Sequence, residues 1–284
     1  MRRIALAAAA LTALGVLAAV PAATTEATTV APTKVLTFVL ENHSLAEMQA
    51  QMPYLNGLAA KYSYATNWTA ISHPSLPNYL ALVAGSTFGI TDDKNPSAHQ
   101  LQAATVFDQA LSKGKTAKAY NESMPSNCYL FNSGQYAVRH NPWTYFVPGR
   151  ANCSAHDVPV TPLLTDAKAN ALPAAGMVTP NLCSDAHDCS LSVADGWLKA
   201  RLPTILASAD FTSGKLVVVV TADEDDGTQG NKVLTVVMHA GTPHRVVTTA
   251  LTHYSLTRYY AQVNGTTPLL KAGTAPDMRA AFGQ

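Results

Sequence analysis

The chain has 284 residues, of which 48% are hydrophobic and 13% are charged, and its formal net charge is +1. This composition is typical of a globular protein with a large core, and it excludes disorder over most of the length. The near-neutral charge gives no electrostatic argument for binding nucleic acid or an anionic membrane surface.

Residues 1–23 have the pattern of a secretory signal peptide. Arg2 and Arg3 precede an apolar stretch, and small residues near Ala22 and Ala23 resemble a cleavage site. Twin-arginine export and a retained membrane anchor are the alternatives, and the flanking residues and the short apolar run fit them less well. Residues 24–33 read as a flexible leader. We therefore expect a secreted protein with one folded domain at 34–284.

From residue 34 onwards, apolar runs alternate with segments of helical pattern. Continuous apolar runs are typical of strands that are covered on both faces. The elements predicted in chain order are a strand at 34–40, helices at 76–85 and 104–115, strands at 116–122 and 174–181, a helix at 192–208, strands at 214–223 and 232–240, and a helix at 253–263. Between them, residues 123–165 read as a long irregular excursion. The alternation predicts an α/β fold, a sheet with helices on both faces.

Polar residues follow three of the predicted strands. Glu41-Asn42-His43 comes after the first strand, Asn181 and the segment CSDAHDC follow 174–180, and four carboxylates follow 214–222. Ligands of open α/β sheets bind at the carboxyl ends of the strands. A surface turn explains one such cluster, but three clusters favour a functional site.

The oxygen-bearing residues at two of these strand ends suit a divalent cation. Glu41, Asn42, Asp223 and Glu224 offer hard ligands, and burying several carboxylates together is otherwise costly. We predict these four as metal ligands. The two acidic residues that follow them, Asp225 and Asp226 before Gly227, are instead expected to form a solvated turn.

Ser75 stands at the start of the helix predicted at 76–85. There its hydroxyl meets free backbone N–H groups and the positive end of the helix dipole, which suits a nucleophile acting on an anion. The alternative is a helix N-cap, which the bare pattern favours. The neighbouring His73 and Asn78 are candidate phosphate-binding residues. Their alternatives are a loop histidine and a surface helix residue.

Two further segments carry candidate site residues. Asp185 and His187 lie between two cysteines, and a histidine beside carboxylates can bind a metal or protonate a leaving oxygen. Arg139 and His140 lie among aromatic residues, and an arginine there can hold a phosphate. The alternatives are an ordinary surface loop and a surface ion pair.

Four cysteines in an exported chain suggest two disulfides, and three pairings are possible. We favour Cys183–Cys189, which are close in sequence, with Cys128–Cys153 as the remaining pair. A zinc–thiolate site is the alternative, although the spacing has no CxxC pair.

The chain resembles a bacterial and fungal phosphoesterase family, because several short motifs follow one another in the order seen there. The segments are ENHS (41–44), HPSLPNYLALVAGST (73–87), ESMPSNC (122–128), YAVRHNPW (136–143), PNLCSDAHD (180–188), DGWL (195–198) and TADEDDG (221–227). That family holds acid phosphatases and phospholipase C enzymes of the alkaline phosphatase superfamily. The resemblance implies a single-domain alkaline-phosphatase-like fold with a central mixed, largely parallel sheet.

The resemblance also implies roles for individual residues. Glu41, Asn42, Asp223 and Glu224 match the family's metal ligands, Ser75 matches its nucleophile, and Asp185 with His187 matches its Asp-x-His pattern. Ala222 departs from the tryptophan that relatives often carry there, which alters packing rather than chemistry. The chain has no room for the extra C-terminal domains of the longer phospholipase C members, which favours the phosphatase branch.

The expected function is therefore that of a secreted, metal-dependent acid phosphatase. Ser75 attacks phosphorus, His187 protonates the leaving alcohol, and Asn78, His73, Asp185, His140 and Arg139 bind the substrate. The expected substrate is a small-molecule or lipid phosphate monoester, phosphatidylinositol 3-phosphate included, bound without membrane insertion by a monomer. A phospholipase C-type phosphodiesterase is the alternative. The cation could be Ca²⁺, Mg²⁺, Mn²⁺, Zn²⁺ or iron.

Overall fold

The computed structural model describes Met1, Ile4 and residues 30–284. Apart from Met1 and Ile4, the predicted signal peptide at 1–23 lies outside the described residues, as do residues 24–29 of the predicted leader at 24–33. In the described part, no helix has the length and apolar character needed to cross a membrane.

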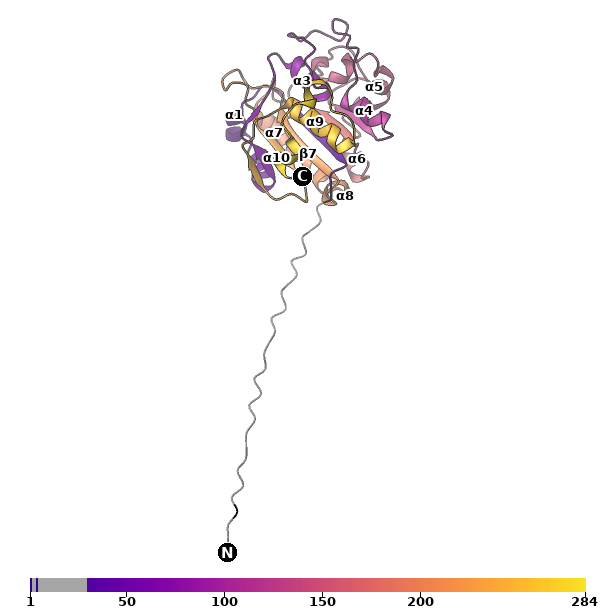
Figure 1. Cartoon of the computed structure of the whole chain (residues 1–284). Coiled ribbons are helices and arrows are strands. Elements are labelled where there is room, and N and C mark those ends of the chain that lie inside the picture. Colours follow the sequence, from indigo (N-terminus) through magenta and orange to yellow (C-terminus); the bar gives the residue numbers. More distant parts are fainter. Residues whose placement is uncertain (2–3, 5–29) are drawn as a thin grey trace.

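One mixed sheet of eight strands forms the centre of the described part (Figure 1). Five neighbouring strands are parallel, β8 is antiparallel to both of its neighbours, and β9 is parallel to β2. In spatial order the strands are β5 (Asp157–Pro159), β4 (Ala117–Asn121), β6 (Ala175–Thr179), β1 (Lys34–Leu40), β7 (Leu216–Ala222), β8 (Thr235–Met238), β2 (Ser63–Ala65) and β9 (Arg245–Val247). The short strands β3 (Trp68–Thr69) and β10 (Leu251–Thr252) pair separately. The predicted largely parallel sheet is confirmed.

Helices cover both faces of the sheet. Tyr260 of α9 donates to Thr37 Oγ1 of β1, while Trp197 of α7 packs edge-on against Phe38, the next residue of the strand. Successive strand residues point to opposite faces, so α9 and α7 lie on opposite sides. The helices are α1 (Leu45–Gln51), α2 (Pro53–Lys61), α3 (Ser75–Ala84), α4 (Val106–Ser112), α5 (Arg150–His156), α6 (Leu163–Lys168), α7 (Leu191–Leu206), α8 (Ala209–Thr212), α9 (His253–Asn264) and α10 (Met278–Phe282), with 3₁₀ turns at Val138–His140, Pro142–Tyr145 and Leu270–Gly273.

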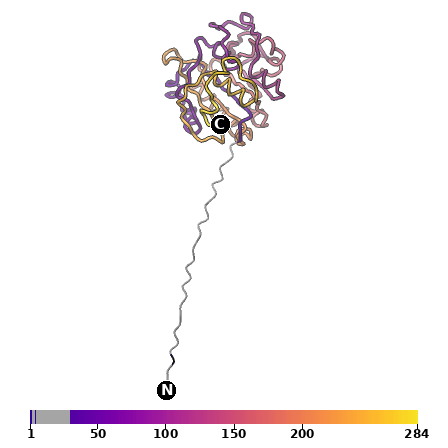
Figure 2. Tube along the Cα trace, in the orientation of Figure 1, coloured from indigo at the N-terminus to yellow at the C-terminus, as the bar shows by residue number. Residues whose placement is uncertain are grey.

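The C-terminal residues fold back onto the body of the molecule, where α10 packs against α9 (Figure 2). The central strands β1 and β7 are buried along nearly their whole length, as their continuous apolar sequences predict. Each predicted strand and helix is present, with ends that differ by a few residues. The helix predicted at 104–115 begins only at Val106, because Thr105 and Asp108 form a capping box.

The excursion predicted at 123–165 is more ordered than its composition suggests. It contains α5 and the edge strand β5, and it is fastened by the Cys128–Cys153 disulfide. The second disulfide joins Cys183 and Cys189, so the favoured cysteine pairing is confirmed and the zinc–thiolate alternative is wrong.

Asp157, at the start of β5, is a buried carboxyl that makes stability depend on pH. Burial raises its pKa to about 7, although Asn121 and Asn141 donate hydrogen bonds of 2.5 and 2.7 Å to its two oxygens. A raised carboxyl pKa favours the folded state below the unfolded pKa of about 4, and that contribution is lost as pH rises through 7.

We therefore expect the wild type to lose stability relative to Asp157→Asn as pH rises from about 4 to 8. The change follows from the shift in pKa and is on the order of 4 kcal/mol. Urea unfolding of both proteins at several pH values measures it. Asp226→Asn, which alters an exposed carboxyl, is the control and should run parallel to the wild type. A constant difference between wild type and Asp157→Asn would contradict the assignment.

Candidate active site

The polar residues that follow β1, β6 and β7 meet at one edge of the sheet. In the parallel register Leu40 lies beside Ala222, so the next residues, Glu41 and Asp223, are neighbours. The backbone N–H of Asp223 donates to Leu40 O at 3.0 Å, and the N–H of Glu41 donates to Asp185 O at 2.9 Å. The polar residues predicted at the carboxyl ends of three strands therefore lie together at one edge of the sheet.

The buried carboxyl groups at this edge include those of Glu41, Asp185, Asp223 and Glu224. Burial raises the pKa of Asp185 and Glu224 to about 8, and it holds the pKa values of Glu41 and Asp223 well above their ordinary range. Neighbouring carboxylates add to the effect, as Asp223 and Asp185 do for Glu41. Burying several negatively charged carboxylates together costs free energy unless a cation lies between them.

Buried atoms without a hydrogen-bond partner among the described residues point into the same region. They include Asn42 Oδ1, Asp223 Oδ2, Asp185 Oδ2 and His140 Nε2. Buried polar atoms are almost always paired, so a set of unpaired ones indicates a ligand. The residues Glu41, His140 and Asp185 also place ligand atoms within 4.8 Å of one another. Carboxylate, amide and imidazole donors together fit a divalent metal.

Ser75 is the first residue of α3, and its hydroxyl faces the carboxylates. The hydroxyl donates to Glu41 Oε2 at 3.0 Å and makes no capping bond, since Pro74 is the N-cap residue. The free N–H of Leu76 is instead satisfied by Asp93 Oδ1 at 2.9 Å. The alternative of Ser75 as a helix cap is therefore wrong.

Asn78 is fully buried, with both ends of its amide in use. Its Oδ1 accepts from the N–H groups of Ile71 and Ser72, and its Nδ2 donates to Ser72 O at 2.7 Å and to Glu224 Oε2 at 2.9 Å. The surface-residue alternative is wrong. In this arrangement the amide holds Glu224 and the turn before α3.

His187 and Arg139 lie on the solvent side of the cluster. His187 Nε2 is 3.1 Å from Arg139 Nη2, its Nδ1 is 2.7 Å from Asp188 Oδ1, and its backbone N–H donates to Asp185 Oδ1 at 2.8 Å. The Cys183–Cys189 disulfide encloses this loop. His140 is buried deeper, with a neutral ring, because burial and the charge of Arg139 lower its pKa.

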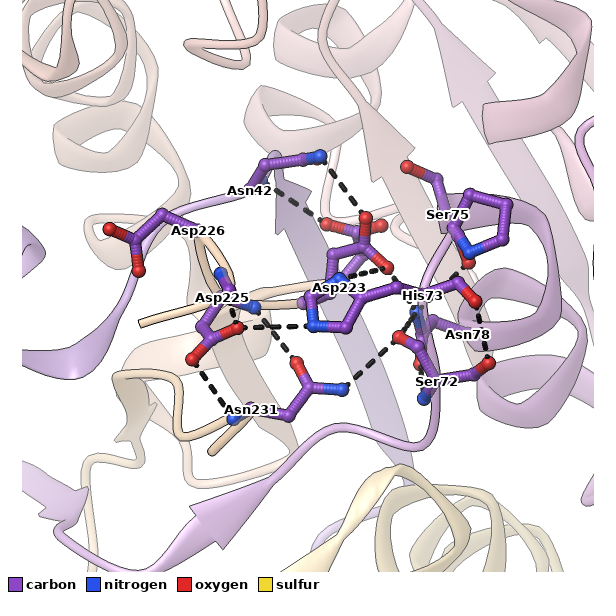
Figure 3. Close-up of polar contacts among 12 residues, drawn as sticks. Asn42, Ser72, His73, Ser75, Asn78, Asp223, Asp225, Asp226 and Asn231 are labelled. Carbon is purple, nitrogen blue, oxygen red and sulfur yellow. Dashed lines mark hydrogen bonds and ion pairs between the residues drawn. The ribbon is translucent and has the colours of Figure 1, made fainter. Parts of the chain in front are cut away.

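The turn after β7 differs from its prediction. Asp225 is buried, and its carboxylate accepts three backbone N–H groups, one of them that of Asn231 (Figure 3). Asp226 is exposed, and among the described residues its side chain bonds only to Thr228. The prediction of a solvated turn is therefore confirmed for Asp226 and wrong for Asp225. The chain folds around the Asp225 side chain and supplies the hydrogen bonds that water would have made.

His73 stands between two of these carboxylates. Its Nδ1 lies 3.3 Å from Glu224 Oε2 and its Nε2 lies 3.2 Å from Asp225 Oδ1 (Figure 3). About half of the side chain is exposed, so it borders the site on the solvent side.

Two buried aromatic residues that the sequence analysis missed support the ligands. Tyr79 donates to Glu41 Oε1, and its ring stacks on His140 at 5.1 Å between centroids and 9° between planes. Its place four residues after Ser75, on the same face of a helix, could have indicated it. His253 bonds the backbone carbonyl of Asp223 and accepts from Trp68 Nε1 at 3.2 Å. No local pattern around His253 points to this contact.

A model of the phosphoesterase family matches residues 34–262 of the chain. The phosphatidylinositol-3-phosphatase of Mycobacterium tuberculosis is 32% identical over 252 residues, which is 88% of this chain and 82% of that protein. The phosphate-repressible acid phosphatase of Penicillium chrysogenum is 32% identical over 217 residues, 71% of this chain and 52% of that protein. The chain spans about half the length of this fungal relative.

Solved structures show the same fold at low identity. A protein in the alkaline phosphatase superfamily from Vibrio parahaemolyticus has a TM-score of 0.58 and 11% identity, covering 88% of this chain and 72% of that one. The lipoteichoic acid synthase LtaP of Listeria monocytogenes has a TM-score of 0.58 and 11% identity, covering 86% and 76%. The alkaline-phosphatase-like fold implied by the motifs is confirmed.

Proposed function

The chain belongs to the phosphoesterase family, and on this premise we propose that it is a secreted, cation-dependent phosphatase that hydrolyses phosphate monoesters. The observation that carries the proposal is the Ser75 hydroxyl, buried and 3.0 Å from Glu41 in a cluster of four carboxyls. Relatives named as an acid phosphatase and as a phosphatidylinositol-3-phosphatase support a monoester substrate, and the second name supports phosphatidylinositol 3-phosphate as one such substrate. Export is supported by the pattern of residues 1–23 and by the two disulfides.

Glu41, Asn42, Asp223 and Glu224 are the residues that we propose to hold the cation, and His140 and Asp185 border the same region. When bound, a divalent cation there supplies charge neutralisation for the phosphate and lowers the pKa of the hydroxyl beside it.

Ser75 is the proposed nucleophile. Its oxygen forms a bond to phosphorus as the bond from phosphorus to the ester oxygen breaks, and its proton passes to Glu41 Oε2, to which the hydroxyl donates. Water then breaks the phosphoserine bond and releases phosphate. The position at the first turn of α3 directs the oxygen toward the carboxyl edge of the sheet.

His187 is the proposed proton donor to the leaving alcohol, and Arg139 the proposed phosphate ligand. The two side chains contact each other at 3.1 Å. Arg139 can only donate, so Nε2 is the acceptor in this contact. A phosphate attracts the guanidinium, so substrate binding would separate Arg139 from His187, and Nε2 would then take up a proton from water and pass it to the ester oxygen, with Asp188 beside Nδ1. Asp185 holds the His187 backbone, His140 and His73 line the site, and Asn78 holds Glu224.

The test compares p-nitrophenyl phosphate, bis(p-nitrophenyl) phosphate, phosphatidylinositol 3-phosphate and phosphatidylcholine as substrates for the wild type. We expect kcat/KM for the monoesters to exceed that for the diesters about 10²-fold, because a diester lacks the second phosphate charge that the cation and Arg139 neutralise. Release of the phosphatidylcholine head group without monoester hydrolysis would instead establish the phospholipase C alternative.

A further inference from the structure

The loop that follows β7 is closed by a reciprocal pair of side chains. The Asp225 carboxylate accepts the N–H groups of Gly227, Gln229 and Asn231 at 2.8, 2.8 and 2.9 Å. In return, the Asn231 side-chain oxygen accepts the N–H of Asp225 at 2.9 Å. Each residue therefore satisfies the backbone of the other, and residues 225–231 form a ring of hydrogen bonds.

Asn231 also binds the segment that leads to the proposed nucleophile. Its Nδ2 donates to Ser72 O at 3.1 Å (Figure 3). Its backbone oxygen accepts from the N–H of Ala70 at 2.8 Å. The residue has a φ of 63°, in the left-handed region that asparagine tolerates. Asn231 thereby joins the loop after β7 to the turn that ends at Ser75. Ser72, its partner in that turn, lies 159 residues before Asn231 in the sequence.

Asp225 also holds His73, which belongs to this same turn. One imidazole nitrogen of His73 is 3.2 Å from Asp225 Oδ1, and the other is 3.3 Å from Glu224 Oε2. Because both ring nitrogens lie against buried carboxylates, the plane and direction of the ring are determined. Glu224 is in turn bonded by Asn78, so the contacts form a closed circuit.

A solvated turn does not need the contacts that Asp225 and Asn231 make with His73 and Ser72. Asp226, the next residue, caps its own turn through Thr228 at the surface, and in the described part of the chain it makes no hydrogen bond or ion pair with the site residues. Burying a carboxylate is costly unless its hydrogen bonds are satisfied. The loop satisfies Asp225 with backbone groups and leaves one of its oxygens facing His73, an arrangement that supports the site rather than the turn.

We propose that Asp225 and Asn231 are positioning residues of the phosphoester site, which together hold His73 and Ser75 in place relative to Asp223 and Glu224. We name the pair the 225/231 clamp. This inference rests on the proposed function and adds two residues to it. The clamp acts through its neighbours and does not touch the substrate.

The test is a double-mutant cycle on monoester hydrolysis. The variants are Asp225→Asn, Asn231→Gly, which keeps the left-handed φ, and the matched control Asp226→Asn. Each of these, and the wild type, is also combined with His73→Gln. Because a misplacement of about 1 Å can cost about 10²-fold in rate, we expect Asp225→Asn and Asn231→Gly to lower kcat 10- to 100-fold. Asp226→Asn should stay within about twofold of the wild type.

The cycle separates positioning from a structural role. If Asp225 acts through His73, adding His73→Gln to Asp225→Asn should cost at least about threefold less than adding it to the wild type or to Asp226→Asn. Effects on kcat that simply multiply would overturn the proposal, as would variants with a lower Tm and an unchanged kcat. A wild type without hydrolysis of any ester would overturn the proposed function itself. If the wild type is active, Ser75→Ala is inactive and the effects of Asp225→Asn and His73→Gln show no coupling, then only the proposal of the 225/231 clamp is overturned.

Discussion

Replacement of Ser75 by alanine is expected to lower kcat for a phosphate monoester about 10³-fold or more. The hydroxyl is the proposed nucleophile, and no other serine or threonine hydroxyl among the described residues donates to the side chains of Glu41, Asp185, Asp223 or Glu224. The fold should be retained. Ser75 makes no capping bond, and the first turn of α3 is held instead by Asp93.

Steady-state kinetics and thermal unfolding of the same preparation measure this prediction. The matched control is Ser44→Ala, which removes a buried serine that does cap a helix. It should lower Tm, because a lost N-cap costs about 1 kcal/mol, while kcat stays near that of the wild type. If Ser75→Ala keeps near-normal kcat, Ser75 is not the nucleophile. If wild type labelled with radioactive phosphate from the substrate yields no phosphoserine, the covalent step is wrong.

Removal of the cation is the second large effect that we expect. Dialysis against a chelator should lower hydrolysis about 10²-fold or more, and added Mg²⁺, Ca²⁺, Mn²⁺ or Zn²⁺ should restore it, with the order of restoration indicating the natural ion. The reason is the cluster of four buried carboxyls together with the unpaired Asn42 Oδ1 and Asp223 Oδ2. Asp223→Asn should reproduce the loss and weaken metal binding in a calorimetric titration. Asp226→Asn should do neither.

The same cluster predicts how the metal-free protein responds to pH. Burial raises the pKa of Asp185 and Glu224 to about 8. Such groups favour the folded state below the unfolded pKa of about 4, and this contribution is lost as pH rises toward 8. The metal-free protein should therefore melt at a lower temperature at pH 8 than at pH 5, and a bound cation should reduce the difference. Metal-free protein that is equally stable at both values, or full activity after verified metal removal, would contradict the cation site.

Much of the fold could be predicted because its signals are local. The largely apolar sequences of β1 and β7 require two covering layers, and the helical stretches between them supply those layers. Parallel strands end at a common edge, so Glu41 and Asp223 could be placed together without any knowledge of the loops. The Cys183–Cys189 bridge is likewise confined to a short segment.

Other features have no local signal. The segment 45–69 contains α1, α2, β2 and β3, and the excursion at 123–165 contains β5, none of which were predicted. Strands of two or three residues are too short to show a periodicity, and they form because neighbouring strands offer hydrogen bonds.

For the site, the sequence by itself determined which residue types stand at each strand end, and with them the metal-binding and nucleophilic candidates. Only the tertiary structure decided that Asp225 is buried, that His140 stacks on Tyr79 beside Glu41, and that Asn231 bonds Ser72. Each of these depends on segments that are far apart in the chain and meet only when the helices and loops pack over the sheet edge. The type of a residue and its local spacing carry no information about such a partner, whereas burial and hydrogen bonding in the folded chain determine it.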